Sequence, residues 1–328
     1  MDYPVRFYEL LNDRVKCGVC PHHCILSESK RGICGVRLLK DGRPVAINYG
    51  EISASAIDPI EKKPLYHFLP GSRILSLGSF GCNMTCQFCQ NYEISQLKPP
   101  SQFISVAQLI EWMGELPDCC GIAFTYNEPL MWYEYVHDAC QSIKRDYPSK
   151  KTVIVTNGYI EKEPLERLLP YVDAMNIDLK GYTNHYYNKI CGAKLEPVLE
   201  TIQKVADQCH LEITTLLVSD ENDSLQEVEA ISKFIYQINP NIPLHLSRYF
   251  PRYKLENRAT EVEVLKQARA VAKQYLNYVY LGNVEGIDCQ TYCPNCHSLL
   301  ISRYHHQTLC YLKEAVCPHC NEFIPIVL

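Results

Sequence analysis

The sequence lacks several features that would assign the protein to a particular class. No stretch approaches the run of about eighteen apolar residues that a membrane-spanning helix needs, and the N-terminal residues lack the apolar core of a signal peptide. Low-complexity tracts and repeats at a solenoid period are also absent. The net charge of −5 on 328 residues is too small to indicate a nucleic-acid-binding surface. We therefore expect a cytoplasmic globular protein with neither a membrane nor a nucleic-acid partner.

Cysteine, in contrast, is over-represented, with eighteen residues that fall mainly into three groups. Without a secretory signal the compartment is reducing, so this abundance indicates metal binding rather than a disulfide framework. The groups are Cys17, Cys20, Cys24 and Cys34; Cys82, Cys86 and Cys89; and Cys293, Cys296, Cys317 and Cys320. Cysteines without ligand-like spacing, Cys191 among them, are expected to be small buried hydrophobes.

Short apolar runs alternate with segments of helical period between about residues 72 and 284, which is typical of a parallel α/β sheet or barrel. The predicted strands cover residues 74–77, 122–125, 152–156, 174–179, 211–218 and 243–247, with a seventh over 278–281. Helix starts are marked by Ser105, Ser224 and Thr260, each followed three residues later by Gln or Glu. We predict a partial (β/α)6 barrel, residues 72–284, between a Cys-rich N-terminal module, 1–71, and a C-terminal metal-binding module, 285–328.

The central cysteine group follows the first predicted strand, within the segment GSFGCNMTCQFCQN. Three thiolates in a Cys-x3-Cys-x2-Cys array can hold three corners of a [4Fe–4S] cluster and leave the fourth iron open. A structural zinc site is the alternative, but a closed zinc site needs four ligands. An open iron favours a cluster that binds a substrate or cofactor over one that only transfers electrons.

With Phe88 before its last cysteine, this segment resembles the signature of the radical S-adenosylmethionine (SAM) superfamily. Across residues 72–284 the chain is similar to the activating enzymes of pyruvate formate-lyase. The resemblance implies that the open iron binds the amino and carboxylate groups of SAM and that Phe88 lies beside the adenine. It also implies reductive cleavage of SAM to a 5′-deoxyadenosyl radical, which takes hydrogen from a protein glycine or from a small molecule.

Polar residues at the ends of later strands correspond to SAM-pocket positions of the activating enzymes. The segment Thr125-Tyr126-Asn127-Glu128-Pro129 resembles the motif that holds the SAM amino group, with Glu128 as a hydrogen-bond acceptor. Taken singly, the remaining candidates are a turn former, a local ion pair or a core histidine, but the resemblance implies SAM contacts from Thr156, Asn157, Asp178, Lys180 and His245. Ligand-binding residues gather at the carboxyl ends of parallel strands, where loops converge.

The flanking cysteine groups predict two further metal sites. Two Cys-x2-Cys knuckles at residues 293–296 and 317–320 indicate a zinc-ribbon or rubredoxin-like module with a structural metal. Zinc is the first choice, and a single iron fits the same four-thiolate geometry. The four N-terminal cysteines fit either zinc or a second iron–sulfur cluster.

The upstream CGVCPHHC segment, the three-cysteine motif, TYNEP and HLSRYFP together resemble the AmmeMemoRadiSam system radical SAM proteins. This resemblance implies AMMECR- or Memo-type proteins as partners, beside a protein substrate and a reductant such as flavodoxin or ferredoxin. The alternative, a non-catalytic metal-binding or electron-transfer protein, explains the cysteines but not the strand-end residues. We therefore expect a radical SAM enzyme.

Overall fold

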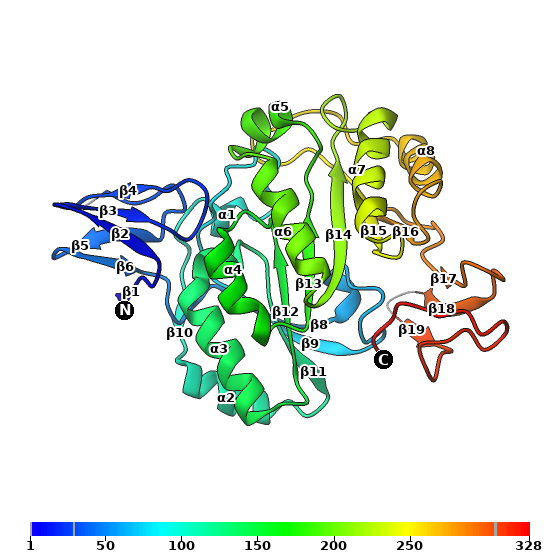
Figure 1. Ribbon diagram of the computed structural model, residues 1–328, viewed down its shortest axis with the longest axis horizontal. Coiled ribbons are helices and arrows are strands. Elements are labelled where there is room, and N and C mark those ends of the chain that lie inside the picture. The colour runs from blue at the N-terminus through cyan, green and yellow to red at the C-terminus, as the bar shows by residue number, and fades with distance from the viewer. Residues whose placement is uncertain (1, 29, 305–306) are drawn as a thin grey trace.

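An eight-stranded sheet forms the centre of the computed structural model, which describes residues 2–28, 30–304 and 307–328 (Figure 1). Its strands lie in the order β16-β15-β14-β13-β12-β11-β9-β8, and all neighbours are parallel except β8 and β9. The strands are β8 (Ala54–Pro59), β9 (Arg73–Gly78), β11 (Cys119–Phe124), β12 (Lys151–Thr156), β13 (Ala174–Asp178), β14 (His210–Leu217), β15 (Leu244–Arg248) and β16 (Val279–Gly282). The prediction of a partial (β/α)6 barrel is confirmed.

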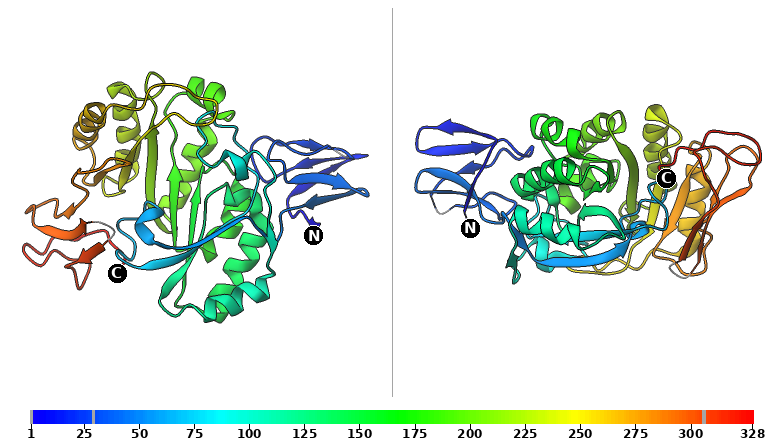
Figure 2. Two further views of the ribbon diagram at one scale, coloured as in Figure 1. Left: turned by 180° about the vertical axis from the view of Figure 1, so that it is seen from behind. Right: turned by 90° about the horizontal axis from the view of Figure 1, so that it is seen from below.

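Helices connect the parallel strands and lie along the outside of the curved sheet (Figure 2). The main helices are α2 (Val106–Gly114), α3 (Tyr133–Asp146), α4 (Lys162–Leu168), α6 (Glu196–Ala206), α7 (Leu225–Ile238) and α8 (Val262–Ala272). Short turns are η1 (Ile60–Lys62), α1 (Tyr92–Ser95), η2 (Pro129–Trp132), η3 (Leu169–Tyr171), α5 (Asn184–Tyr186) and η4 (Tyr187–Cys191). In the part of the chain that the structure describes, no helix has the length and apolar character needed to cross a membrane.

Two of the three predicted helix starts are found, although only one is a complete capping box. Ser105 caps α2, with hydrogen bonds in both directions between Ser105 and Gln108. Ser224 caps α7 through the Glu227 backbone, whereas the Glu227 carboxylate accepts a hydrogen bond from Tyr182 N. The prediction at Thr260 is wrong because its hydroxyl donates to the Leu217 carbonyl at 2.5 Å, and α8 begins one residue later.

The edge strand β8 belongs to the central sheet, although the sequence placed its residues in the N-terminal module. It pairs antiparallel with β9 from Ala54 opposite Gly78 to Pro59 opposite Arg73. The segment that follows β8 closes one end of the barrel: Phe68 packs in an apolar cluster with Ile60, and His67 N donates to Glu212 inside the barrel at 2.7 Å. The contact between His67 and Glu212 has no local sequence signal, since the two residues are 145 positions apart.

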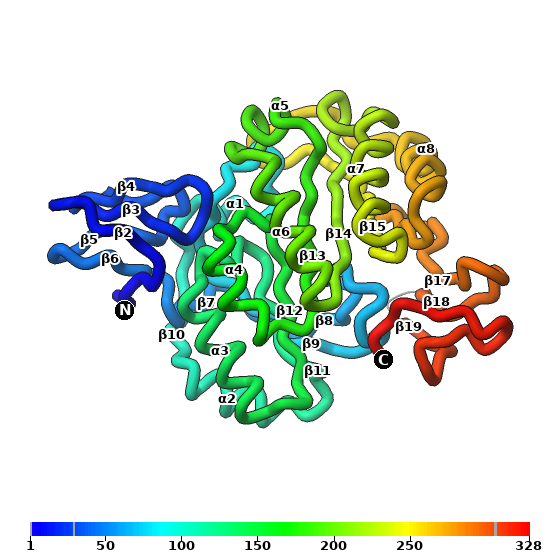
Figure 3. The backbone as a smooth tube through the Cα atoms, viewed as in Figure 1, coloured from blue at the N-terminus to red at the C-terminus, as the bar shows by residue number. Residues whose placement is uncertain are grey.

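The two Cys-rich modules lie on opposite sides of the barrel (Figures 1 and 3). The N-terminal module contains two three-stranded antiparallel sheets, β1 (Tyr3–Pro4), β6 (Arg43–Ala46) and β5 (Arg37–Lys40), and β2 (Tyr8–Leu11), β3 (Arg14–Cys17) and β4 (Ile25–Leu26). A small pair joins β7 (Glu51–Ile52) to β10 (Gln102–Phe103). The C-terminal module has a three-stranded sheet of β17 (Thr291–Tyr292), β18 (Leu299–Tyr304) and β19 (Gln307–Cys310).

Candidate active site

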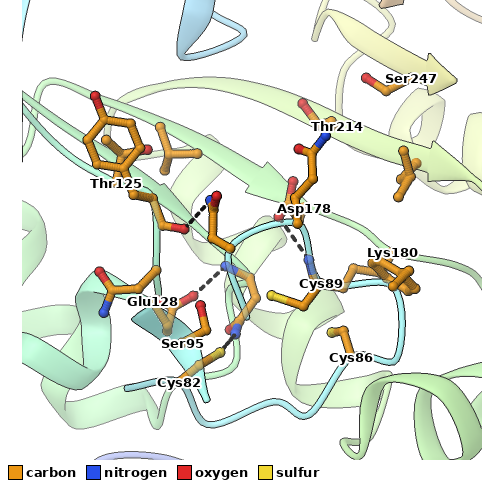
Figure 4. A pocket seen from close by; sticks show the side chains of 18 of the residues that line it. Cys82, Cys86, Cys89, Ser95, Thr125, Glu128, Asp178, Lys180, Thr214 and Ser247 are labelled. Carbon is orange, nitrogen blue, oxygen red and sulfur yellow. Dashed lines mark hydrogen bonds and ion pairs between the residues drawn. The ribbon is translucent and has the colours of Figure 1, made fainter. Parts of the chain in front are cut away.

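The loop after β9 carries Cys82, Cys86 and Cys89. All three line a cavity of about 420 Å³ at the carboxyl ends of the barrel strands, where Figure 4 shows them close together. This loop also lies against the N-terminal module. Gly81 has a φ of +91°, and a methyl group on it would lie only 2.5 Å from Val36 Cγ1. Glycine is therefore required for both the backbone conformation and the space.

Eight of the nine residues predicted to contact SAM line the same cavity. They are Phe88, Tyr126, Asn127, Glu128, Thr156, Asn157, Asp178 and Lys180. The parallel strands explain this convergence, because β11, β12 and β13 end side by side and each is followed by one of the polar segments. The structure thus brings the three thiols and the strand-end residues to one place.

Glu128 is a buried carboxylate at the wall of the cavity. It accepts hydrogen bonds from Thr156 Oγ1 at 2.6 Å, from Asn157 N at 2.8 Å and from Leu130 N at 3.0 Å. Burial raises the pKa of Glu128 to about 7, although these hydrogen bonds act in the opposite direction. A cation that enters the cavity would favour the ionised carboxylate.

Asn157 connects the cysteine loop to the end of β12. Its Nδ2 lies 3.7 Å from Cys82 Sγ and donates to Asn83 Oδ1 at 2.9 Å. Its side-chain oxygen accepts from Tyr159 N, as in an Asx turn. Asn157 is therefore both a turn former and a direct contact of the cysteine loop.

Asp178 and Lys180 form an ion pair after β13, with Lys180 Nζ 2.9 Å from Asp178 Oδ2 (Figure 4). Burial alone would lower the pKa of Lys180, but the nearby charges of Asp178 and Cys86 outweigh it and raise the pKa. Lys180 Nζ also lies 5.9 Å from the centre of the Phe88 ring. The pair therefore places a lysine ammonium beside both the thiols and the predicted adenine contact.

The cavity also contains basic residues that sequence reasoning missed. Lys62 and Lys63, from the turn after β8, line it. Lys63 Nζ lies 2.8 Å from Asp58 Oδ2, which also accepts from Tyr126 OH at 2.9 Å. Tyr126 has a φ of +73°, a strained conformation for a side chain of this size. These contacts join β8 to the TYNEP segment, and only the long-range pairing of β8 with β9 could have revealed them.

A second missed contact is Cys191, which is fully buried beside the cysteine loop. Its thiol lies beside that of Cys86, and its carbonyl accepts a hydrogen bond from Thr85 N at 2.9 Å. The expectation that Cys191 is a buried small residue holds, but it also supports the loop. Cys191 is not among the residues that line the cavity.

His245 is the one predicted SAM contact that the structure does not bring to the cavity. It lies on β15 two residues before Ser247, which does line the cavity, and is therefore one layer deeper in the barrel. There His245 Nε2 lies 2.6 Å from Glu212 Oε2, and its ring stacks on Tyr280. Its position matches that of a hydrogen-bonded core histidine.

The four cysteines of the C-terminal module form a compact group. All four sulfurs lie within 4.8 Å of one another, with Cys293 and Cys320 at 3.5 Å and Cys296 and Cys317 at 3.6 Å. Four thiolates at about 2.3 Å from one zinc ion lie about 3.8 Å apart in a tetrahedron. The group therefore has the size of a site for a single ion, as the two knuckles predict.

Known proteins resemble this chain in both sequence and fold. Residues 77–235 match the family described as the radical SAM superfamily. An uncharacterized protein of Methanocaldococcus jannaschii is 43% identical over 335 residues, which cover 98% of each chain. Among solved structures, a radical SAM methyltransferase from Sphaerobacter thermophilus has a TM-score of 0.53 at 11% identity and covers 91% of this chain and 81% of its own.

Streptococcus suis SuiB bound to S-adenosylmethionine gives a TM-score of 0.51 at 12% identity and covers 62% of this chain and 48% of its own. At such low identity both structures show only that the fold is shared. The family match spans the three-cysteine loop and four of the strands whose ends line the cavity, β11 to β14. The chain therefore belongs to the radical SAM superfamily, whose members are enzymes that use a [4Fe–4S] cluster and SAM.

Proposed function

We propose that this enzyme cleaves SAM reductively in the cavity lined by Cys82, Cys86 and Cys89. When bound, a reduced [4Fe–4S] cluster supplies the electron that splits SAM into methionine and a 5′-deoxyadenosyl radical. One observation carries the proposal: three thiols, with no fourth cysteine among the described lining residues, share a cavity with the strand-end carboxylates and amides. Three thiolates suit three irons of a cubane and leave the fourth open to a ligand.

The side chains in this cavity match the chemistry of SAM. Glu128 is the proposed acceptor for the SAM ammonium group, because a charge-assisted hydrogen bond to a buried carboxylate is strong. Asn157, Asp178 and Lys180 offer donors and acceptors to the remaining polar atoms, and Phe88 offers an apolar ring to the adenine. His245 is not included in this set because it lies below the cavity.

For the hydrogen donor we propose a polypeptide, as the resemblance to glycyl-radical activating enzymes implies. SuiB, which has been solved bound to its precursor peptide, shares the fold with a TM-score of 0.52 at 14% identity. AMMECR- and Memo-type proteins are the first candidates to test as substrates or partners. The proposed electron donor is a flavodoxin or ferredoxin.

The C-terminal group is proposed to hold zinc as a structural ion. Four thiolates close its coordination sphere, so no position is left for a substrate. The module contacts the barrel through Arg303, whose guanidinium donates to the Tyr66 carbonyl at 2.8 Å and, within the module, to Thr291 Oγ1 at 2.8 Å. Zinc would thus hold the fold of a module that packs on the closed end of the barrel.

The test of SAM binding is the electron paramagnetic resonance spectrum of the reduced, anaerobically reconstituted protein. Adding SAM is expected to change the cluster signal of the wild type and of His245→Asn. The signal change should be lost in Cys89→Ala, which lacks one of the three thiols. An unchanged wild-type signal at saturating SAM would contradict the proposal.

A further inference from the structure

The four N-terminal thiols come together in space although they span eighteen residues of sequence. Cys17 ends β3, and its backbone N–H donates to the Cys24 carbonyl at 2.9 Å. Every pair among Cys17, Cys20, Cys24 and Cys34 is close enough for the two thiols to interact electrostatically. Three of the four are buried, and Cys24 is half-buried. They are therefore a second set of converging sulfur ligands.

Backbone N–H groups lie near each of these sulfurs. Those of Val19, His22 and Val36 are near the sulfur of the cysteine two residues before them, and Ile33 N donates to Cys24 Sγ at 3.4 Å. The same two-residue geometry occurs in the radical SAM loop, where Met84 N donates to Cys82 Sγ at 3.4 Å. Backbone N–H groups directed at sulfur stabilise a thiolate and thus prepare it for metal binding.

The spacing of the sulfurs separates this site from the C-terminal one. Among the described residues, the C-terminal group is the one set of three or more candidate ligands whose atoms all lie within 4.8 Å of one another. Neither the N-terminal thiols nor Cys82, Cys86 and Cys89 form such a set. Ligands at the corners of an iron–sulfur cubane must lie farther apart than ligands that share one ion. The N-terminal group therefore differs from the C-terminal single-ion group, as the radical SAM thiols do.

The N-terminal site is in direct contact with the radical SAM loop. His22, two residues after Cys20, lies with Nε2 2.7 Å from the Asn83 carbonyl oxygen, and Asn83 is the neighbour of Cys82. On the other side, a methyl group on Gly81 would lie 2.7 Å from the Cys34 carbonyl oxygen. Two short paths thus join the two cysteine groups, one through His22 and one through the backbone at Cys34.

We propose that Cys17, Cys20, Cys24 and Cys34 bind a second iron–sulfur cluster that passes single electrons to the cluster at Cys82, Cys86 and Cys89. The step balances as a one-electron exchange: the second cluster is oxidised, the radical SAM cluster is reduced, and no bond or proton changes. A flavodoxin or ferredoxin re-reduces the second cluster. The relay role depends on the proposed SAM cleavage, whereas the metal assignment does not.

The direct test is the metal content of a variant in which Cys82, Cys86 and Cys89 are all replaced by serine, reconstituted anaerobically with iron and sulfide. It should keep about half of the wild-type iron and sulfide, with about one zinc per chain from the ribbon. Reduced flavodoxin should reduce the remaining cluster, and SAM should not alter its signal. An iron-free variant with a second zinc, or with no second metal, would overturn the assignment.

The complementary variant carries Cys17→Ser, Cys20→Ser and Cys34→Ser, with Cys209→Ser as the control. It should lose the other half of the iron but retain the SAM-dependent signal change when dithionite is the reductant. With reduced flavodoxin, reduction of its remaining cluster should be at least about tenfold slower than in the wild type. An unchanged rate would overturn the relay, whereas a wild type without any SAM-dependent change would count against SAM cleavage itself. If this variant does not fold, the first variant still tests the step from flavodoxin to the second cluster, and no reduction of that cluster would overturn the relay.

Discussion

Arg37 and Glu134 form a bidentate ion pair between the N-terminal module and α3, with nitrogen–oxygen distances of 2.9 and 2.8 Å. Each side chain is only 1% exposed, so removing one partner leaves the other charge buried and unpaired. The pair also places the guanidinium near Cys17 and Cys34. It therefore joins the N-terminal cysteine group to the barrel.

Glu134→Ala is expected to lower the free energy of unfolding by about 3–5 kcal/mol, because it breaks a buried pair. The double variant Arg37→Met/Glu134→Leu should recover most of that loss, since no charge is then left buried. Urea unfolding of the metal-loaded proteins measures both values. A loss below about 1 kcal/mol in the single variant would show that water reaches Arg37 and that the pair is not a structural link.

Glu128 gives SAM binding a predictable pH dependence. Because burial raises the pKa of Glu128 to about 7, the carboxylate is mostly protonated at pH 6 and mostly ionised at pH 8. A cationic ammonium group prefers the ionised form, so the Kd for SAM should fall by about tenfold across this range. Glu128→Gln should bind more weakly and lose this dependence. Equal Kd values at pH 6 and 8 in the wild type would contradict the assigned contact.

His67 and Glu212 make the closed end of the barrel sensitive to acid. Burial lowers the pKa of His67 to about 3, and its Nε2 lies 2.7 Å from Tyr280 OH. Burial alone would raise the pKa of Glu212, but hydrogen bonds with His210 and His245 outweigh it and lower the pKa. Both groups bind more protons when unfolded, so stability is complete above about pH 6.5 and falls as the pH decreases.

Between pH 7.5 and pH 5, His67 alone should cost about 2 kcal/mol of unfolding free energy. His67→Gln retains a donor and an acceptor but does not titrate, so its stability should change less over the same range. Urea titrations of both proteins at the two pH values make the comparison. Identical pH profiles would show that another group controls acid unfolding.

The three-cysteine loop and the C-terminal cysteine group should separate experimentally. Cys320→Ala is expected to lose zinc and to lower the thermal stability of the C-terminal module, while SAM cleavage continues. Cys89→Ala is expected to keep its zinc and its stability but to abolish cleavage. Zinc analysis, calorimetry and a cleavage assay on the same samples test this division. Equal loss of folded protein in both variants would contradict it.

The sequence predicted the barrel well because parallel strands and their helices have local signals. Each of the seven predicted strands lies within a few residues of its position in the structure, and the strand-end motifs converge because parallel strands share one carboxyl edge. The resemblance to activating enzymes identified nine residues as SAM contacts, and eight of them line the cavity. The same resemblance identified His245 as a SAM contact. Whether this residue of β15 reaches the cavity or lies deeper in the barrel depends on the strand register.

What the sequence missed depends on contacts between distant segments. No periodic signal in β8 is strong enough to assign this strand to the barrel. The positions of Asp58 on β8, and of Lys62 and Lys63 after it, in or near the cavity were therefore not predicted. Cys191 lacks ligand-like spacing, and only the fold places it against Cys86. Thr260 matched a capping box, but a hydrogen bond to β14 takes its hydroxyl instead.

The most direct test of the central claim is 5′-deoxyadenosine production from SAM by the reduced, anaerobically reconstituted enzyme, with Cys82→Ala as the control. The structure and the superfamily predict that the wild type forms 5′-deoxyadenosine and methionine in equal amounts and that the variant forms neither. Product from both proteins would show that cleavage does not depend on the three-cysteine site. No product from a wild type with a verified reduced cluster and no SAM-dependent change in its signal would contradict SAM cleavage at this cavity.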